Sequence, residues 1–295
     1  MIPGACGYLW KTIMGAMEPI IFRTQLRHSS EALQFMLRKR FRRSNPESLF
    51  FYTLHKCAST LFSDYILNNL IGLKHVDYTL DLYRGRLELS SCKPLAFASH
   101  GYVYGPIRVS GMGFNRNLDR LLNIPTMSAD FVSDKIALFF VRDPRDILVS
   151  AYYSFGYTHG YSEVPELRRG QERLRAEIQA MTVDEYALNS ADNQIKHFTT
   201  IHQLANACHR SVILKYEDMV DRFDHFSKQL TEFVDVDPHV LRQIQRRSRP
   251  RNQERGNSHR RSGRTGGFRS KLEPATVAAL NQRLRGILDC FQYPV

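Results

Sequence analysis

Short apolar runs that alternate with amphipathic segments constrain the fold of this chain more than any other feature. The runs are Leu49–Leu54, Leu95–Ser99, Ile136–Val141 and Val212–Tyr216. Apolar runs of this length are typical of strands that are buried on both faces. After the first run, Thr60–Leu70 repeats apolar residues at helical spacing, and after the third, Asp143 and Pro144 are good starting residues for a helix. Strands that alternate with helices predict βαβ units, and therefore an α/β fold with a central parallel sheet of about five strands flanked by helices.

The size and composition of the chain are those of an ordinary globular protein. Its 295 residues are 43% hydrophobic and 24% charged, which allows a sizeable core. We expect two parts, a basic helical extension at residues 1–45 and one α/β domain at residues 46–295 on which it packs. No stretch reaches the ~18 consecutive apolar residues of a membrane-spanning helix. We therefore expect a cytoplasmic protein, and the mixture of basic and apolar residues at 8–43 leaves peripheral contact with a membrane open.

The five cysteines point away from cross-linked or metal-stabilised folds. They are scattered along the chain and form no Cys-x-x-Cys pair; they are Cys6, Cys57, Cys92, Cys208 and Cys290. An odd number of scattered cysteines argues against a disulfide framework and against a structural zinc site. A reducing compartment is the natural setting for such a chain.

The positive charge of the chain is local. The formal net charge is +12, and residues 242–271 alone hold ten arginines and one lysine against Glu254. Residues 1–50 hold eight lysines or arginines against three glutamates. A local cationic surface indicates anionic ligands, although a charge run is also what a solvated face looks like.

The first candidate ligand site follows the first apolar run. Residues 55–60 read His-Lys-Cys-Ala-Ser-Thr and lead directly into a helical pattern. A loop between a strand and a helix presents backbone amides to an anion, and Lys56, Ser59 and Thr60 add a charge and two hydroxyl groups. In a parallel sheet, ligands bind beyond the carboxyl ends of the strands. The Gly-x-x-x-x-Gly-Lys pattern of ATPase loops is absent, so the segment indicates a phosphate site of another kind.

Two further segments carry cationic side chains that suit a phosphate. Arg142 follows directly on the third run, and Ser150 lies on the next helix, close enough to reach the same group. Residues 261–269 read Arg-Ser-Gly-Arg-Thr-Gly-Gly-Phe-Arg, where glycines allow close approach of the backbone and arginines supply charge. Each segment also fits a plain structural role, such as an ion pair between Arg142 and Asp146.

Together and in this order, the segments resemble those of the sulfotransferase family that uses 3′-phosphoadenosine 5′-phosphosulfate (PAPS). The first resembles the family's phosphosulfate loop, Pro-Lys-Ser-Gly-Thr-Thr-Trp, and the second its 3′-phosphate motif. Residues 261–266 resemble the family's Arg-x-Gly-x-x-Gly, and residues 216–218 its Tyr-Glu-Asp segment, whose tyrosine lies near the adenine. The resemblance spans residues 49–271 and implies a set of nucleotide-binding residues: Lys56, Cys57, Ala58, Ser59, Thr60, Leu61, Arg142, Ser150, Tyr216, Arg261, Ser262 and Gly263.

The sequence departs from the family pattern at several positions. His55 stands in place of proline, and Cys57 and Ala58 stand in place of Ser-Gly. Leu61 replaces the tryptophan that would stack on adenine, which puts that contact in doubt, and Phe268 replaces a second tryptophan. The residues expected to contact the phosphates are retained.

The resemblance implies a P-loop-like sulfotransferase fold and a reaction. A sulfuryl group passes from PAPS to a hydroxyl group, or to an amine, of a small-molecule, glycan or lipid acceptor, and adenosine 3′,5′-bisphosphate (PAP) is released. Lys56 would stabilise the charge that develops on the bridging oxygen. No metal is expected, because lysine and arginine neutralise the donor. His100 ends the second predicted strand, at the ligand crevice, and resembles the family's histidine base in Lys-Thr-His. Glu88 is a second candidate because some branches use a glutamate.

Two other functions are compatible with the sequence. A nucleotide-dependent kinase of related fold would bind ATP in preference to the 3′-phosphorylated nucleotide. A basic protein without catalytic activity would use residues 242–271 to bind nucleic acid or anionic lipid. The ordered set of motifs favours the sulfotransferase interpretation, for which no nucleic-acid partner is expected.

Overall fold

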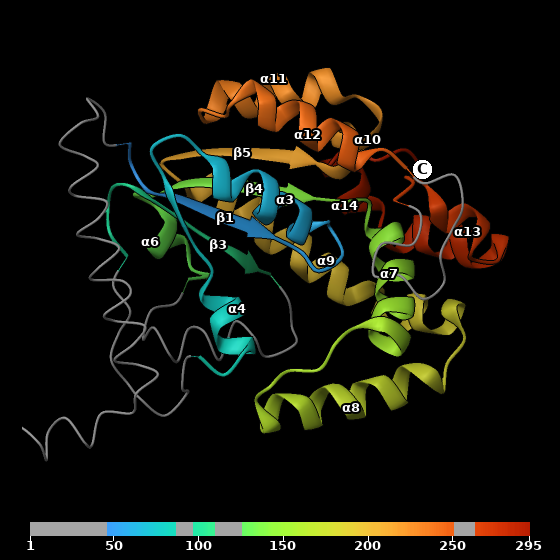
Figure 1. The fold of residues 1–295 in the computed structure, drawn as a ribbon. Helices are drawn as coiled ribbons and strands as arrows, with labels where there is room; N and C mark the ends of the chain where they lie inside the picture. Colours follow the sequence, from blue (N-terminus) through green and yellow to red (C-terminus); the bar gives the residue numbers. More distant parts are fainter. Residues whose placement is uncertain (1–45, 87–96, 110–125, 251–262) are drawn as a thin grey trace, which may run out of the picture.

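The computed structural model describes residues 46–86, 97–109, 126–250 and 263–295 (Figure 1). The expected N-terminal extension at residues 1–45 lies outside these ranges. So do three of the candidate site residues, Glu88, Arg261 and Ser262.

The core of the fold is a five-stranded sheet in which every neighbouring pair is parallel. Its order is β2-β3-β1-β4-β5. The strands are β1 (Leu49–Thr53), β2 (Lys74–Val76), β3 (Tyr102–Arg108), β4 (Ile136–Val141) and β5 (Arg210–Lys215). The prediction of a parallel α/β sheet of about five strands is confirmed. Because β1 lies at the centre, the loop that follows it reaches both halves of the sheet.

Helices cover both faces of the sheet, with α3 on one face and α9 on the other (Figure 1). The α-helices are α3 (Ser59–Tyr65), α4 (Tyr78–Tyr83), α6 (Ala129–Val132), α7 (Pro144–Tyr153), α8 (Pro165–Gln179), α9 (Val183–Ala207), α10 (Tyr216–Asp221), α11 (Phe223–Phe233), α12 (Pro238–Ser248), α13 (Pro274–Arg283) and α14 (Arg285–Cys290). Shorter turns are η1 (Leu67–Asn69), η2 (Ser154–Thr158), which has π-helical geometry, and η3 (Gly267–Ser270). Across the described ranges, none of the helices combines the length and the apolar character needed to span a bilayer.

Burial on both faces of the sheet explains why the strands are continuously apolar. All residues of β1 and β4 are buried. Aromatic rings fill the space between strand and helix: Phe51 stacks on Phe62 of α3 with ring centroids 4.6 Å apart, and Tyr52 stacks on Phe139 at 5.1 Å. Each large side chain buried in this way contributes about 1.5–3 kcal/mol to stability. The packing fixes the β1–α3 connection, which carries the first motif.

Of the four predicted strands, one is misplaced. The structure confirms the runs at β1, β4 and β5, but Phe97–Ser99 form no strand, and the strand of this region begins at Tyr102. The strand Tyr102–Arg108 contains Gly105 and Pro106, residues that usually interrupt a strand. Gly105 is needed there because a Cβ would lie 2.5 Å from the carbonyl oxygen of Phe51. The three-residue β2 is too short to give a sequence signal.

Candidate functional site

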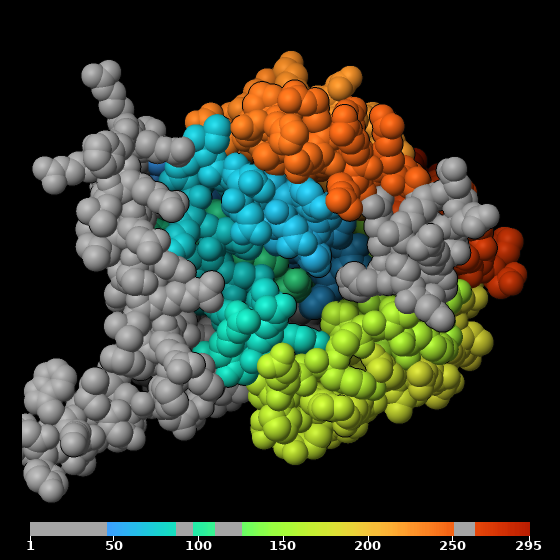
Figure 2. Space-filling model, viewed as in Figure 1, coloured from blue at the N-terminus to red at the C-terminus, as the bar shows by residue number. Residues whose placement is uncertain are grey.

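A cavity of about 640 Å³ lies where the carboxyl ends of the strands meet the helices. Figure 2 shows its opening between α3, α4 and α7. Its lining comes from the last residue of β3 and from the segments that follow the other four strands. The loop after β1 lies in the middle, so the cavity has two sides. The β5 side is lined by Arg142, Ser150, Tyr216, Gly263 and Arg264, and the β2 side by Asp77, Thr79, Tyr83, Arg108 and His159.

The loop after β1 has an unusual backbone that leads into an open helix end. Lys56 and Ala58 both have left-handed conformations, with φ of 69° and 56°. Helix α3 then begins at Ser59, and no side chain caps it. Residues other than glycine take up this conformation at a cost, and such strain is typical of functional loops. The first amides of an uncapped helix are available to an anion.

The residues of the predicted phosphate loop lie in two different environments, the cavity and the core. Lys56, Ala58, Ser59, Thr60 and Leu61 all line the cavity. The side chain of Cys57 does not, because it is buried in the core. Burial raises the pKa of this thiol to about 12, which makes it an unreactive filler of a small space.

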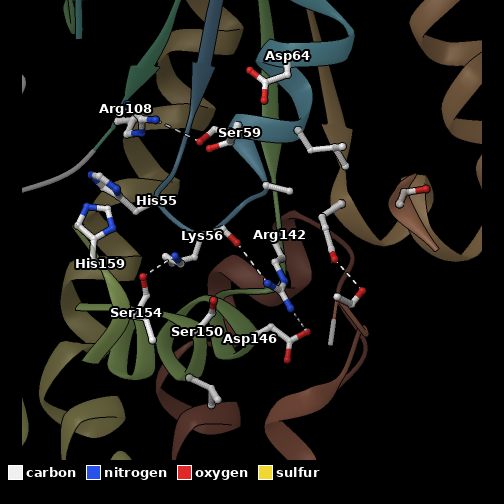
Figure 3. Close-up of a pocket in the computed structure, with 18 of the residues that line it drawn as sticks. His55, Lys56, Ser59, Asp64, Arg108, Arg142, Asp146, Ser150, Ser154 and His159 are labelled. Carbon is white, nitrogen blue, oxygen red and sulfur yellow. Dashed lines mark hydrogen bonds and ion pairs between the residues drawn. The ribbon is translucent and has the colours of Figure 1, made fainter. Parts of the chain in front are cut away.

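Lys56 extends from the loop toward the turn that follows α7. Its Nζ donates a hydrogen bond of 2.7 Å to Oγ of Ser154, and it lies 5.9 Å from the centre of the Phe155 ring (Figure 3). A neutral hydroxyl group is thus the acceptor in this contact. The ammonium group is held inside the cavity between its two sides.

Arg142 joins the loop after β1 to the glycine-rich segment near the C-terminus. Its Nη1 donates to the carbonyl oxygen of Lys56 at 3.2 Å, and its Nη2 donates to the carbonyl oxygen of Arg264 at 3.2 Å. The guanidinium group lies 4.5 Å from the centre of the Tyr216 ring. Burial works against its charge, but Asp146 raises the pKa of Arg142, so the group stays a cation. One side chain therefore assembles residues that are far apart in sequence.

Asp146 and Tyr216 fix the glycine-rich segment from two directions. The carboxylate of Asp146 accepts hydrogen bonds from the backbone amides of Gly266, at 2.8 Å, and Phe268, at 3.0 Å. The hydroxyl group of Tyr216 donates to the carbonyl oxygen of Gly263 at 2.7 Å. Both carboxylate oxygens of Asp146 therefore accept hydrogen bonds from backbone amides. The segment is held so that Gly263 and Arg264 line the β5 side.

The β2 side has its own cation and carboxylate. Arg108 is the last residue of β3, and its Nη2 donates to Oγ of Ser59 at 3.3 Å. Asp77 follows β2 directly and caps α4, accepting a hydrogen bond from the amide of Leu80 at 2.8 Å. Burial raises the pKa of Asp77, while the nearby charge of Arg108 acts in the opposite direction. The pair extends the polar lining away from Ser59.

Two histidines lie beside Lys56 at the boundary of the β2 side. His55 precedes Lys56, and His159 follows η2, and both line the cavity (Figure 3). Burial lowers the pKa of His55, and the charges of Arg108 and Lys56 lower it further. His55 is therefore neutral near neutral pH. The far wall is closed where the hydroxyl group of Tyr83 donates to the carbonyl oxygen of Gly160.

The structure places His100 away from this cavity. Rather than ending a strand, His100 precedes β3, and it forms a bridge with Glu47, which precedes β1. In a parallel sheet both positions belong to the amino edge, opposite the cavity, and His100 is not among the lining residues. The expectation that His100 lies at the ligand crevice is wrong, because the strand of this region begins only at Tyr102, three positions after the predicted run ends at Ser99. The described residues contain no group of three or more potential metal ligands.

The residues of the β2 side carry no recognisable sequence signal. Asp77, Arg108 and His159 belong to no motif: Asp77 and His159 are single polar residues that follow a strand or turn, and Arg108 is the last residue of a strand. Arg108 could have been found if residues 102–108 had been assigned to a strand, since side chains at the carboxyl end of a strand face the crevice. On the β5 side, Arg264 and Lys271 also line the cavity beside the predicted Arg142, Ser150, Tyr216 and Gly263.

Comparison with known proteins identifies a family. The model of the sulfotransferase domain matches residues 33–283 of the chain. Among curated proteins, no sequence matches.

Two solved structures resemble this chain at low sequence identity. Mouse sulfotransferase SULT7A1 complexed with PAP is 12% identical, with a TM-score of 0.50, covering 82% of this chain and 84% of that one. Retinol dehydratase in complex with androsterone and PAP is also 12% identical, with a TM-score of 0.43, covering 82% and 80%. At this identity, the likeness to SULT7A1 concerns the fold alone.

Proposed function

This chain belongs to the sulfotransferase domain family, and from that premise we propose that its cavity transfers a sulfuryl group from PAPS to a hydroxyl group of an acceptor and releases PAP. In this proposal the β5 side binds the nucleotide and the β2 side receives the acceptor. The loop after β1 lies between them and holds the sulfuryl group.

The observation that carries the proposal is the position of Arg142. It hydrogen-bonds to the backbone of Lys56 and of Arg264, and so brings the phosphosulfate-like loop and the glycine-rich segment to one place. Ser150 of α7, the helix that follows Arg142, also lines the cavity. Arginine and hydroxyl groups together suit a phosphate monoester such as the 3′-phosphate of PAP. PAP carries a phosphate at its 3′ and at its 5′ position, and the cavity offers a separate cation for each, Arg142 and Lys56.

The loop after β1 suits the sulfuryl end of the donor. Lys56 supplies a cation, Ser59 and Thr60 supply hydroxyl groups, and α3 begins there without a side-chain cap. As the S–O bond breaks, negative charge builds up on the bridging oxygen, and a positioned cation stabilises it. Transfer of this kind depends mainly on positioning and on charge stabilisation. Leu61 and Tyr216 line the cavity where apolar contact with the adenine is expected.

The test is calorimetric titration with PAP and, in parallel, with ATP. Wild-type protein should bind PAP and bind ATP more weakly. Arg142→Ala should weaken PAP binding about 30-fold, equivalent to about 2 kcal/mol, because it removes a charge-assisted contact. Arg283→Ala is the matched control, since Arg283 pairs with Asp192 on the surface, 2.7 Å away. Ser150→Ala is a milder second variant, expected to weaken PAP binding severalfold.

The outcomes separate the sulfotransferase from the kinase. Equal binding of PAP and ATP would favour a kinase, and binding that Arg142→Ala leaves unchanged would place the nucleotide elsewhere. Melting temperatures of both variants exclude a loss caused by unfolding. Transfer of label from [35S]PAPS to a panel of alcohols, phenols, sugars and amines then identifies the acceptor class.

A further inference from the structure

Transfer to a hydroxyl group requires a residue that takes the hydroxyl proton, and His100 lies at the wrong edge of the sheet to do so. In the described part of the chain, four cavity residues beyond the β5 side have side chains of suitable chemistry. They are His55, Asp64, Asp77 and His159. Their positions and charges differ enough to choose among them.

Asp77 is positioned by two elements and by one cation. It follows β2 directly, and its carboxylate is fixed at the start of α4 by the amide of Leu80, at 2.8 Å. Arg108 interacts electrostatically with Asp77 and donates to Ser59 at 3.3 Å, so it is the shared neighbour of the carboxylate and of the loop after β1. Asp77 is half-buried and faces the cavity. Burial raises its pKa, which makes the carboxylate a stronger base.

The charge balance favours a carboxylate over the two histidines. A base becomes one unit more positive when it takes a proton. A histidine would become a cation beside Lys56 and Arg108, whose charges already lower the pKa of His55. His159 adds to the same electrostatic group. A carboxylate becomes neutral instead, a change that burial favours.

Position separates Asp77 from Asp64. Asp64 is exposed on α3, and Figure 3 shows it beyond Ser59, turned away from Lys56 and Ser154. Asp77 comes from the neighbouring half of the sheet, where β2 and β3 pair. It therefore borders the space that the acceptor would fill on the β2 side.

We propose that Asp77 is the general base of the transfer reaction, an inference that rests on the proposed function. The acceptor oxygen forms a bond to sulfur while its proton passes to the carboxylate of Asp77. The bond between sulfur and the bridging oxygen breaks, and its electron pair stays on the 5′-phosphate of PAP. Arg108 acts as a positioning residue that orients Asp77 toward the sulfuryl group.

The deciding variant is Asp77→Asn, because asparagine also caps a helix and so retains the start of α4. The reactions are single-turnover assays with [35S]PAPS and three acceptors: 2-naphthol, 4-nitrophenol and, without added acceptor, water. We expect Asp77→Asn to slow transfer to 2-naphthol and to water about 100-fold or more. Transfer to 4-nitrophenol, a more acidic phenol, should fall less. If neither phenol is accepted, the reaction with water decides.

The same variant should remove a pH dependence. In the wild type, transfer should increase with pH as Asp77 ionises, and Asp77→Asn should lack this rise. The charged groups that act on Asp77 are Arg108 on β3, His75 on β2 and Asp81 on α4, and His159 faces the same cavity from the end of η2. Asp81→Asn is the comparison on the same helix: it should keep the rise, shifted toward lower pH, because the charge of Asp81 raises the pKa of Asp77.

Measuring PAP affinity distinguishes a failure of the Asp77 assignment from a failure of the proposed function. Asp77→Asn should bind PAP within about threefold of the wild type and melt at a similar temperature. Wild-type rates in Asp77→Asn, or a larger loss in His159→Gln, His55→Gln or Asp64→Asn, would overturn the assignment and leave the proposed function standing. A wild-type protein that neither binds PAP nor releases sulfate would overturn the proposed function itself.

Discussion

The two sides of the cavity are built in different ways. On the β5 side, side chains that line the cavity donate hydrogen bonds to backbone carbonyl oxygens of other lining residues. Arg142 donates to Lys56 and Arg264, and Tyr216 donates to Gly263. On the β2 side, polar residues come singly from separate elements, and Arg108 is linked to the loop after β1 through Ser59. The β5 side is thus a pre-assembled network, while the β2 side is a wall whose composition can change one residue at a time.

This difference matches what each side has to recognise. A nucleotide donor is the same molecule in every reaction, so a network of arginine, hydroxyl and backbone groups can be fixed for it. An acceptor differs from one enzyme to another, and in the proposed function it meets the wall formed by α4, the end of β3 and the turn after α7. In the proposed function, the chemistry takes place where the two sides meet, at Lys56, Ser59 and Arg108.

The largest effect on the rate of transfer is expected from a substitution where the two sides meet. Lys56→Met should lower the rate of transfer about 100- to 1,000-fold, the usual cost of removing one group that stabilises developing charge. PAP affinity should fall far less, because the network around Arg142 retains its own contacts. Lys228→Met is the control, since Lys228 is exposed on α11. Equal losses of rate and of PAP affinity would mean that Lys56 belongs to the nucleotide network instead.

Much of the β5 side could be predicted from sequence because its residues follow strands in short motifs. The runs at Ile136–Val141 and Val212–Tyr216 locate Arg142 and Tyr216 at the ends of strands, and helical spacing locates Ser150. Such positions follow from local pattern alone. Their mutual hydrogen bonds do not, because they depend on how the segment after Gly263 returns to α7.

The β2 side was missed because its strands lack a clear local pattern. β2 has only three residues, and β3 contains a glycine and a proline that tertiary packing tolerates. The register of β3 against β1 decides that Arg108, and not His100, lies at the carboxyl edge. A shift of a few residues along a strand moves a side chain from one edge of the sheet to the other. A strand at Leu95–Ser99 would put His100 at the carboxyl edge, whereas the strand that begins at Tyr102 leaves it at the amino edge.

A smaller effect is expected behind the β5 side, at Glu217. Burial raises the pKa of this carboxyl group from 4.5 to about 7, although it accepts the amide of Asp143 at 2.9 Å. The folded protein therefore holds this proton more tightly than the unfolded chain. Its contribution to stability falls as pH rises from about 4.5 to about 7, by about 3 kcal/mol at most.

Glu217→Gln retains an oxygen that can accept the Asp143 amide and removes the buried charge. The variant should unfold at higher denaturant concentration than the wild type at pH 8, with little difference at pH 5. Glu232→Gln, at an exposed position of α11, should show neither change. If Glu217→Gln destabilises the protein at pH 8, the charge of Glu217 supports the network around Arg142, and the β5 side depends on it.

The smallest expected effect concerns the strained loop that both sides share. Ala58 has a left-handed backbone with φ of 56°, which costs a residue with a Cβ about 1–2 kcal/mol. Ala58→Gly removes this cost but loses about 0.5–1 kcal/mol through the greater freedom of glycine in the unfolded chain. A net gain of about 0.5–1 kcal/mol in the free energy of unfolding is expected. Gly105→Ala is the opposite case, because a Cβ there meets the oxygen of Phe51 at 2.5 Å and must destabilise the sheet. If Ala58→Gly gains stability and binds PAP as the wild type does, the strain at Ala58 serves neither side of the cavity. If Ala58→Gly binds PAP more weakly, the alanine keeps the loop in the conformation that binds the phosphosulfate.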